Sequence, residues 1–325
     1  MRILVTGGAG FIGSNLVERL LSNDRVSFVK VLDNLSTGSL SNLVPFKDNL
    51  KFQFIEADIR NYNECFDACK DIDLISHQAA LGSVPRSIKD PLTTNEVNIT
   101  GTLNIFNAAK ENRISRVIYA ASSSTYGDHP GLPKVEENIG NPLSPYAVTK
   151  YVNELYARIY ADVYGLELIG LRYFNVFGPR QNPAGPYAAV IPLFAEALIK
   201  NQSPVINGDG SHSRDFTYVD NAVQANILAL FTQNKNALNQ VYNIACGEQT
   251  SLLQLYEYLR MEALIDIKPI YGPDRKGDVK HSLADISKAK KLLNYDPSVK
   301  VNEGLRRTFE WYKRKFNNHQ STINE

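Results

Sequence analysis

The chain has 325 residues, a formal net charge of +1, 43% hydrophobic residues and 21% charged residues. This balance gives no sign of a nucleic-acid or membrane surface, and no apolar run approaches the roughly 20 residues that a membrane span requires. The first apolar run, Ile3–Val5, is too short for the core of a signal peptide. Cys65, Cys69 and Cys246 cannot all pair and have no histidines at metal-ligand spacing, so we expect reduced thiols, no metal site and a cytoplasmic protein.

Apolar, β-branched runs alternate with segments of helical period through the first half of the chain. The runs predict buried strands at 3–6, 26–32, 52–57, 74–77, 117–121 and 168–171. The segments between them predict helices at 12–22, 62–69, 98–112 and 145–164. Repeated strand–helix–strand units predict an α/β fold of the Rossmann type, with a doubly wound parallel sheet covered by helices on both faces.

The regular alternation of strands and helices stops in the second half of the chain. A loop rich in glycine, proline and asparagine at 175–183 marks this change. Helices are predicted at 188–200 and 218–231, a strand at 241–245, two helices within 285–316, and a frayed polar tail at 317–325. We therefore predict a dinucleotide-binding domain over 1–175, to which the chain returns at about 216–245. Residues 176–325 are expected to form mainly a smaller α/β substrate domain.

Gly7, Gly10 and Gly13 follow the first predicted strand and open the first predicted helix. Glycine suits a turn that takes positive φ and lets the backbone approach a pyrophosphate closely. The helix that follows, from about Phe11 and Ile12, directs its free N–H groups and positive end at phosphate. In this strand–turn–helix setting the glycines favour a dinucleotide site over an ordinary tight turn.

Asp33 ends the second predicted strand, where an acid meets the adenosine ribose hydroxyls in dinucleotide-binding folds. A carboxylate there repels a 2′-phosphate, and the residues that follow, from Asn34 on, supply no arginine. These features favour NAD over NADP. Asp58, after the third predicted strand, suits the adenine amino group or, alternatively, the N-cap of a helix.

Tyr146 and Lys150 lie one helical turn apart, so their side chains share a helix face. A phenol with a pKa near 10 is a poor base at neutral pH, and we expect the Lys150 ammonium and a positive nicotinamide to favour the phenolate. Ser122, Ser123 and Ser124 follow a buried strand, where parallel sheets place their ligands. A hydroxyl there can relay a proton between a substrate alcohol and Tyr146, although serines in such turns also cap helices.

The chain resembles the extended short-chain dehydrogenase/reductases over nearly its whole length. The segments on which this resemblance rests are 6–13, 122–127, 144–150, 172–180 and 214–219. More narrowly, 80–87, 122–133 and 277–285 resemble the bacterial UDP-N-acetylglucosamine 4-epimerases of polysaccharide biosynthesis. This resemblance implies an isomerase that retains NAD and inverts C4 of a UDP-sugar through a 4-keto intermediate. It also implies a homodimer formed through helices near 98–112 and 145–164.

The resemblance assigns roles position by position. Tyr146 takes the place of the base, Lys150 of its partner and Ser122 of the catalytic Ser/Thr, with Ser123 beside it; which serine relays the proton stays open. The implied cofactor contacts are Gly7, Gly10, Phe11, Ile12, Gly13, Asp33, Asn34, Gly38, Asp58, Ile59, Gln78, Ala79, Ala80, Tyr146, Lys150, Tyr173 and Val176. The implied substrate contacts are Ser83, Ser122, Ser123, Ser124, Asn175, Ala189, Val190, Arg214, Arg275, Asp278 and Ser282.

Two departures from relatives narrow the expected function. Ser123 and Ser124 stand where relatives that dehydrate or decarboxylate nucleotide sugars carry an acid, which disfavours both reactions. Ser282 stands where epimerases restricted to plain UDP-hexoses carry a tyrosine, so an N-acetyl group has room, and plain UDP-hexoses stay possible. The alternatives are a UDP-uronic acid 4-epimerase, in which Arg86 or another basic residue meets a C6 carboxylate, and a non-catalytic NAD-sensing protein.

Overall fold

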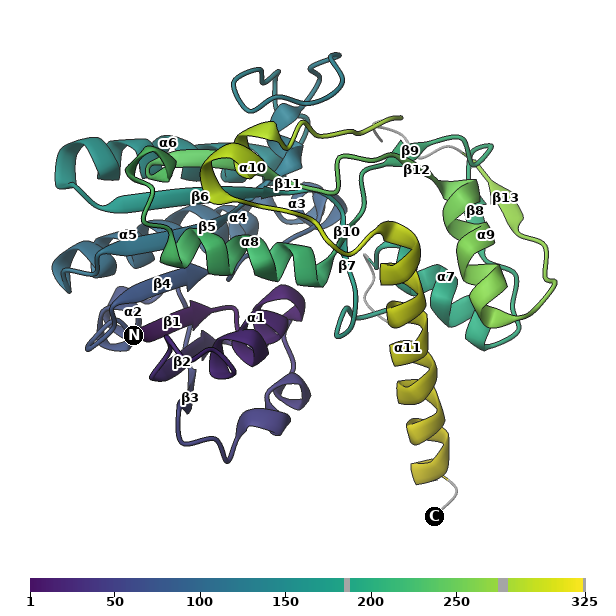
Figure 1. Ribbon diagram of the computed structural model, residues 1–325, viewed down its shortest axis with the longest axis horizontal. Helices are drawn as coiled ribbons and strands as arrows, with labels where there is room; N and C mark the ends of the chain where they lie inside the picture. The colour runs from purple at the N-terminus through teal and green to yellow at the C-terminus, as the bar shows by residue number, and fades with distance from the viewer. Residues whose placement is uncertain (184–187, 274–279, 324–325) are drawn as a thin grey trace.

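A seven-stranded sheet forms the centre of the computed structural model, which describes residues 1–183, 188–273 and 280–323 (Figure 1). Its strand order is β11-β6-β5-β4-β1-β2-β3, and every neighbouring pair is parallel. The strands are β1 (Arg2–Thr6), β2 (Phe28–Asp33), β3 (Phe52–Glu56), β4 (Leu74–His77), β5 (Arg116–Ser122), β6 (Glu167–Tyr173) and β11 (Gln240–Ile244). The predicted Rossmann-type parallel sheet is confirmed.

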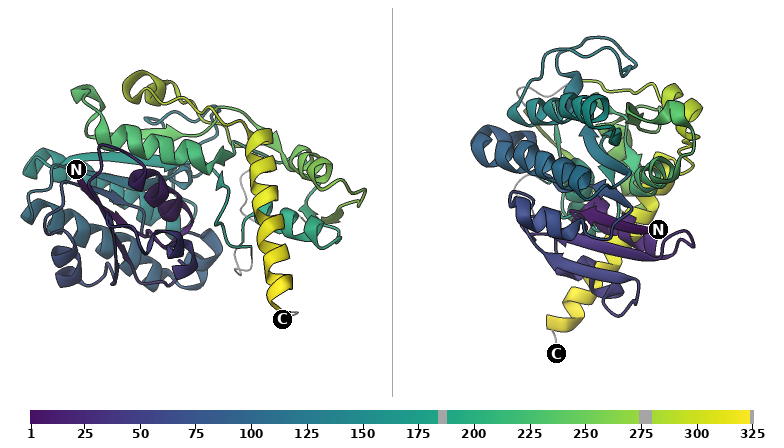
Figure 2. Two further views of the ribbon diagram at one scale, coloured as in Figure 1. Left: turned by 60° about the horizontal axis from the view of Figure 1, so that its bottom comes forward. Right: turned by 90° about the vertical axis from the view of Figure 1, so that its left-hand side faces the viewer.

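Helices cover both faces of this sheet (Figure 2). One face carries α2 (Tyr62–Ala68), α5 (Gly101–Glu111) and α6 (Pro145–Tyr164), and the other carries α1 (Phe11–Leu21) and α8 (Val219–Phe231). Alternate side chains of a strand point to opposite faces, so Ile3 and Val5 join one buried cluster while Leu4 joins the other. Both faces are therefore apolar, which explains why the strands read as continuous hydrophobic runs.

The strand order reverses between β1 and β4. From β1 the chain builds outward through β2 and β3, and from β4 it builds in the other direction through β5 and β6. Open parallel sheets bind their ligands at such a reversal, beyond the carboxyl ends of the strands. The glycine turn after β1 and the loop after β4 meet at this point.

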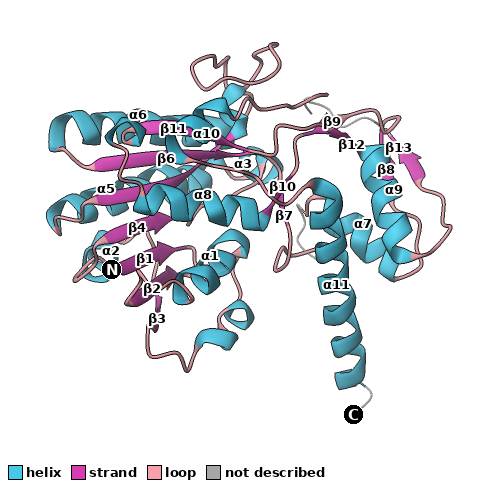
Figure 3. Ribbon diagram, viewed as in Figure 1, coloured by secondary structure: helices cyan, strands magenta, loops and turns pink. Residues whose placement is uncertain are grey.

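Most of the remaining elements lie beyond the carboxyl ends of the strands, toward the right of Figures 1 and 3. They include three strand pairs: β7 (Val176–Phe177) with β10 (Thr217–Tyr218), β8 (Val205–Asn207) with β13 (Ile270–Gly272), and β9 (Ser213–Arg214) with β12 (Thr250–Ser251). Helices α7 (Val190–Ile199), α9 (Leu252–Ala263) and α11 (Val301–Ile323) pack together there, while α10 (Ser287–Leu293) returns to β11 and α8. The predicted division into domains at residue 175 stays a prediction.

Several predicted boundaries move because of local contacts. The strand predicted from residue 26 begins at Phe28, since the Val26 N–H donates to the carbonyl of Asn23 in a turn. The helix predicted at 98–112 is a π-helical turn, η3 (Glu96–Thr100), followed by α5. The prediction that the tail frays from residue 317 is wrong, because α11 continues to Ile323. No glycine or proline interrupts that helix after Gly304, and ion pairs one turn apart, such as that between Arg314 and Glu310, support it.

Among the described residues, no helix has the length and apolar character of a membrane span. The three cysteines are buried and free, and Cys65 lies in α2 with Cys69 as its C-cap, as the helical spacing predicted. Burial raises the pKa of each thiol to about 12, so these side chains act as small apolar groups in the packing.

Candidate active site

A cavity of about 560 Å³ opens at the carboxyl ends of the central strands. Its lining includes many of the predicted cofactor contacts: Gly7, Gly10, Phe11, Ile12, Gly13, Asp33, Asn34, Ile59, Gln78, Ala79, Ala80, Tyr146, Lys150, Tyr173 and Val176. It also includes Ser122, Ser123 and Asn175 from the predicted substrate contacts. Residues predicted to serve cofactor and substrate thus share one cavity, although they come from distant parts of the chain.

Other predicted contacts lie outside this lining, namely Gly38, Asp58, Ser83, Ser124, Ala189, Val190, Arg214 and Ser282. Arg275 and Asp278 fall outside the described residues. Arg214 donates from Nη1 to the carbonyls of Ser213 and Lys280, each at 3.0 Å, which ties β9 to the segment that carries Ser282. The Ser282 hydroxyl is buried and forms no hydrogen bond with any residue that the structure describes. The roles of all these residues toward a substrate stay predictions.

The glycine turn is packed so tightly that side chains would not fit in it. Gly7 has φ +69°, and a Cβ there would lie 2.6 Å from the Ala79 nitrogen. A Cβ on Gly13 would lie 2.1 Å from the carbonyl oxygen of Gly7. Gly10 is the N-cap of α1 and offers no side-chain cap, so the first N–H groups of the helix face the cavity end without a side-chain acceptor. This is the arrangement that receives a pyrophosphate, and the turn fits a dinucleotide.

The Asp33 carboxylate is tied to the glycine turn. It is only 7% exposed, with Oδ2 accepting from the Ala9 N–H at 2.9 Å and Oδ1 from the Leu35 N–H at 2.8 Å. Burial raises the pKa of Asp33, while these backbone donors oppose the shift. The side chain is therefore fixed at the end of β2, in the place expected for the ribose partner, and Ser36 and Thr37 extend the cavity beyond it.

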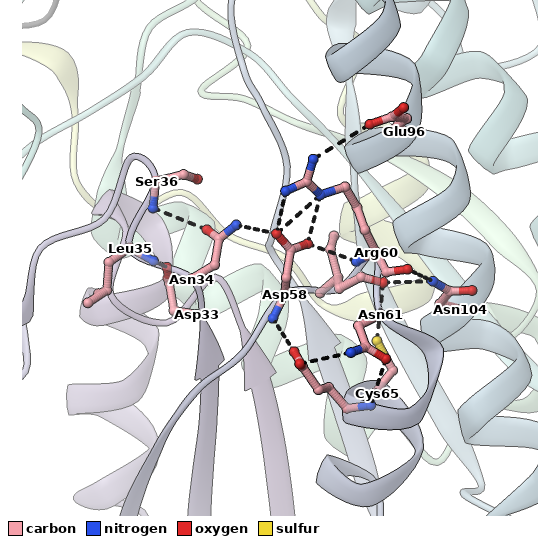
Figure 4. A network of polar contacts seen from close by, with 12 residues as sticks. Asp33, Asn34, Leu35, Ser36, Asp58, Arg60, Asn61, Cys65, Glu96 and Asn104 are labelled. Atoms are coloured by element: carbon pink, nitrogen blue, oxygen red, sulfur yellow. Dashed lines mark hydrogen bonds and ion pairs between the residues drawn. The ribbon is translucent and has the colours of Figure 1, made fainter.

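Asp58 sits in the polar network of Figure 4. Its Oδ2 lies 2.7 Å from Nη2 of Arg60 and accepts from Nδ2 of Asn34 at 2.9 Å. These partners, Arg60 first, lower the pKa of Asp58 to about 2. The alternative that Asp58 caps a helix is wrong, because Asn61 is the N-cap of α2 and accepts from the Glu64 N–H. Its proposed contact with adenine stays a prediction.

Tyr146 and Ser122 meet where α6 begins and β5 ends. Ser144 caps α6 by accepting from the Ala147 N–H at 3.1 Å, which fixes the first turn that carries Tyr146. Ser122 accepts from the hydroxyl of Ser124 at 2.9 Å and interacts with the Tyr146 hydroxyl. Ser122 also accepts from the backbone N–H of Ser124, so it caps the turn that follows β5, and its role as a proton relay stays a prediction.

Burial acts on the pKa values of both Tyr146 and Lys150. Burial raises the pKa of Tyr146 by more than its hydrogen bond with Ser122 lowers it. The Nζ of Lys150 donates to the carbonyl of Ala120 at 2.8 Å. Burial lowers the pKa of Lys150 to about 8, against the charge of Glu154, which raises it. The predicted lowering of the tyrosine pKa by Lys150 and a positive nicotinamide stays a prediction.

Two cavity-lining side chains are held by a polar network that no sequence pattern predicts. The Tyr173 hydroxyl donates to Oε1 of Gln78 at 3.0 Å and accepts from Nδ2 of Asn226 at 2.7 Å. Gln78 in turn donates to the Ser76 hydroxyl at 2.9 Å. Because Asn226 lies on α8, about 150 residues away from β4, no sequence pattern links these groups.

Asn98 is a second residue that sequence reasoning missed. It is fully buried in the π-helical turn η3, accepts from the Leu81 N–H at 2.8 Å and donates to the Thr149 hydroxyl at 3.1 Å. It thereby joins the loop after β4 to the helix turn between Tyr146 and Lys150. π-Helical turns are often found at functional sites, but a hydrophobic pattern does not reveal them.

The fold and the cavity define a dinucleotide-dependent enzyme, because the glycine turn and the acid of β2 face the same cleft as a tyrosine, a lysine and a serine. A family model described as the NAD dependent epimerase/dehydratase family matches residues 3–245. The chain belongs to this family, and NAD is its cofactor.

Several solved structures share the fold over nearly the full length. A UDP-N-acetylglucosamine 4-epimerase from Methanobrevibacter ruminantium M1, in complex with UDP-N-acetylmuramic acid, is 41% identical with a TM-score of 0.91, over 97% of this chain and 98% of that one. A UDP-glucose 4-epimerase from Thermotoga maritima, with UDP-glucose, is 37% identical with a TM-score of 0.91, over 97% and 100%. A UDP-glucuronic acid 4-epimerase from Bacillus cereus, with UDP-glucuronic acid and NAD, is 34% identical with a TM-score of 0.90, over 97% and 100%.

Proposed function

We propose that this enzyme interconverts UDP-N-acetylglucosamine and UDP-N-acetylgalactosamine by inverting C4 of the sugar. The chain is a UDP-sugar 4-epimerase, as its full-length similarity to enzymes of that class indicates. The observation that carries the proposal is the cavity itself, in which Tyr146, Lys150 and Ser122 face the dinucleotide turn. Oxidation of a secondary alcohol requires a proton acceptor for the hydroxyl and a hydride acceptor for the carbon that bears it.

The choice of an acetamido sugar rests on two observations. Ser282, rather than a tyrosine, occupies the position that the family resemblance assigns to the sugar pocket, so that position leaves space for a 2-N-acetyl group. The relative from M. ruminantium, at 41% identity, is named for UDP-N-acetylglucosamine. Ser123 and Ser124 place no carboxylic acid beside Ser122, which supports epimerisation over dehydration or decarboxylation.

The proton transfer follows from the positions of three side chains. NAD, when bound, supplies the acceptor and donor of hydride at C4. Tyr146, as phenolate, accepts the C4 hydroxyl proton directly or through the Ser122 hydroxyl, and returns it after the sugar presents its other face. Lys150, as ammonium, stabilises the phenolate and is placed to hold the nicotinamide ribose. Both directions use the same groups, so the enzyme needs no external reductant.

Inversion requires that the nucleotide is held firmly while the sugar turns. Arg214 offers a guanidinium, which suits a diphosphate because it donates to two oxygens at once. Asn175 lines the cavity and donates from Nδ2 to the carbonyl of Asp215 at 3.0 Å, so a hydrogen bond joins the two segments that carry the proposed nucleotide contacts. Ala189 and Val190, at the start of α7, are proposed to contact the uridine.

Proton NMR of the purified enzyme with UDP-N-acetylglucosamine tests the proposal directly. We expect the anomeric signal of the galacto epimer to appear without added cofactor, because NAD is regenerated in each cycle and stays bound. No conversion with or without added NAD contradicts the substrate assignment. Parallel incubations with UDP-glucose and UDP-glucuronic acid identify the substrate in that case, and the B. cereus relative favours the uronic acid as the second candidate.

We also propose that the enzyme is a homodimer that pairs through α6. Exposed large apolar residues gather on α6, α3 (Val84–Lys89) and α4 (Pro91–Asn95), which pack together. They are Val148, Leu155, Tyr156, Ile159, Val163 and Tyr164 on α6, with Val84, Ile88 and Leu92. Within the described chain α5 contributes no large exposed apolar residue, so α3 and α4 replace it in the proposed interface.

Ile159→Glu is expected to convert the dimer to a monomer. Ile159 is 52% exposed in the single chain, and a glutamate there would be buried without a partner in the dimer. Light scattering after size exclusion should give a mass near 36.3 kDa for the variant and twice that mass for the parent. Met261→Glu, on the equally exposed surface of α9, should leave the mass unchanged. A parent that elutes as a monomer would contradict the interface.

A further inference from the structure

Glu154 shares a helix face with the proton-transfer residues. Tyr146, Lys150 and Glu154 follow one another at intervals of four residues on α6, so their side chains lie along the face that packs on β5 and β6. Glu154 is buried, with an exposed fraction of 8%. A carboxylate in such a place needs a partner, because burying an unpaired charge is costly.

Arg172, from β6, is that partner. Its Nε donates to Oε1 of Glu154 at 2.8 Å and its Nη2 to Oε2 at 2.7 Å, so the contact is bidentate. The remaining guanidinium nitrogen, Nη1, donates to the carbonyl of Glu136 at 2.9 Å. The guanidinium carbon also lies 4.8 Å from the ring centre of Tyr126, which ends the turn that begins after Ser122. The ion pair therefore connects the helix that carries the base to the serine turn.

The charges around Lys150 give this ion pair a second consequence. The ammonium is buried, and Glu154 is the group whose charge favours it. His77, from β4, is neutral because burial lowers its pKa to about 3. Arg172, from β6, is a cation, and Tyr146, on α6, is neutral as long as its hydroxyl keeps the proton. Removal of Glu154 would therefore leave the buried guanidinium of Arg172 without the carboxylate that it pairs with, on the helix face that carries Lys150.

We propose that Glu154, fixed by Arg172, is a positioning residue that keeps the Lys150 ammonium charged and correctly placed beside Tyr146. This inference rests on the proposed function, in which Lys150 assists proton transfer at C4. It assigns the buried ion pair a role in the reaction in addition to its role in packing. A purely structural pair would affect the stability of the fold but not the ionisation of the active site.

The pH dependence of kcat in Glu154 variants tests the inference. In Glu154→Gln, the alkaline limb of the kcat–pH profile should move about one pH unit toward lower pH, because Lys150 loses its proton more easily. Activity above pH 8 should therefore fall roughly tenfold. KM and the amount of bound NAD should equal those of the parent. Glu154→Asp keeps the charge and should keep the limb of the parent. Arg158→Gln, at an 83% exposed position on the same helix, serves as the matched control. An unchanged limb in Glu154→Gln would overturn the inference.

A second cavity allows an independent test by chemical rescue. This cavity, of about 470 Å³, is lined by Glu154, Arg172 and Tyr119, among others, and shares no lining residue with the dinucleotide cleft. In Glu154→Ala, added acetate should restore kcat above pH 8, because it can occupy the vacated carboxylate position beside Arg172, whereas uncharged acetamide should not. Equal effects of acetate and acetamide would contradict the role of charge. A parent without activity on any UDP-sugar would instead contradict the proposed function, so the two failures are distinguishable.

Discussion

Tyr146→Phe is expected to lower kcat by about 10³-fold while leaving the fold and the bound NAD intact. The substitution removes the hydroxyl proposed to act as the base, and general acid–base catalysis typically contributes 10²- to 10⁴-fold. The ring itself keeps its packing at the start of α6. NMR turnover of the UDP-sugar measures kcat, and the absorbance of the released nucleotide measures NAD.

Tyr156→Phe provides the matched control for that experiment. Tyr156 lies on the same helix but is 39% exposed on its outer face, away from the cavity. We expect parental kcat from this variant. If Tyr146→Phe retained more than a tenth of the activity, Ser122 or another group would have to act as the base, and the assignment of Tyr146 would be wrong.

The parallel sheet and the cofactor end of the cavity could be predicted because their signals are local. The apolar runs that form β1, β4 and β5 are buried on both faces, and a run of that kind identifies a parallel strand without knowledge of its neighbours. Gly7, Gly13 and Asp33 have fixed spacing around one strand–turn–helix unit, which the sheet brings into contact.

Contacts made between distant elements could not be predicted in the same way. Glu154 and Arg172 are an ordinary helical glutamate and an ordinary strand arginine until β6 lies beside α6. Asn98 depends on a π-helical turn that no hydrophobic period reveals. Burial also decides the pKa of Tyr146, and a sequence does not show how deep a side chain lies in the fold. The sequence therefore indicated the groups that meet in the cavity, but not the ion pair and the π-helical turn that pack around them.

Gly13→Ala is expected to abolish NAD retention and, with it, activity. A Cβ at this position would lie 2.1 Å from the Gly7 carbonyl oxygen and 2.8 Å from the Gly8 Cα, both of them backbone atoms. Because neither atom can rotate away, the turn and the start of α1 must separate. Overpacking of this kind costs about 1–3 kcal/mol of stability, and it displaces the N–H groups proposed to receive the pyrophosphate. Chromatography of the nucleotide released from the purified variant, together with thermal unfolding, measures both effects.

Gly82→Ala separates the effect of the clash from that of adding any methyl group to the cavity. Gly82 also lines the cavity, but a Cβ there would meet no atom within 4 Å. We expect this variant to retain NAD and to unfold at the temperature of the parent. Parental NAD content in Gly13→Ala would show that the turn can widen without losing the cofactor, and the tight approach of α1 to β1 would then not be what holds the dinucleotide. If Gly13→Ala loses NAD and Gly82→Ala keeps it, the geometry of this turn determines cofactor retention. That geometry requires that no methyl group is present at position 13.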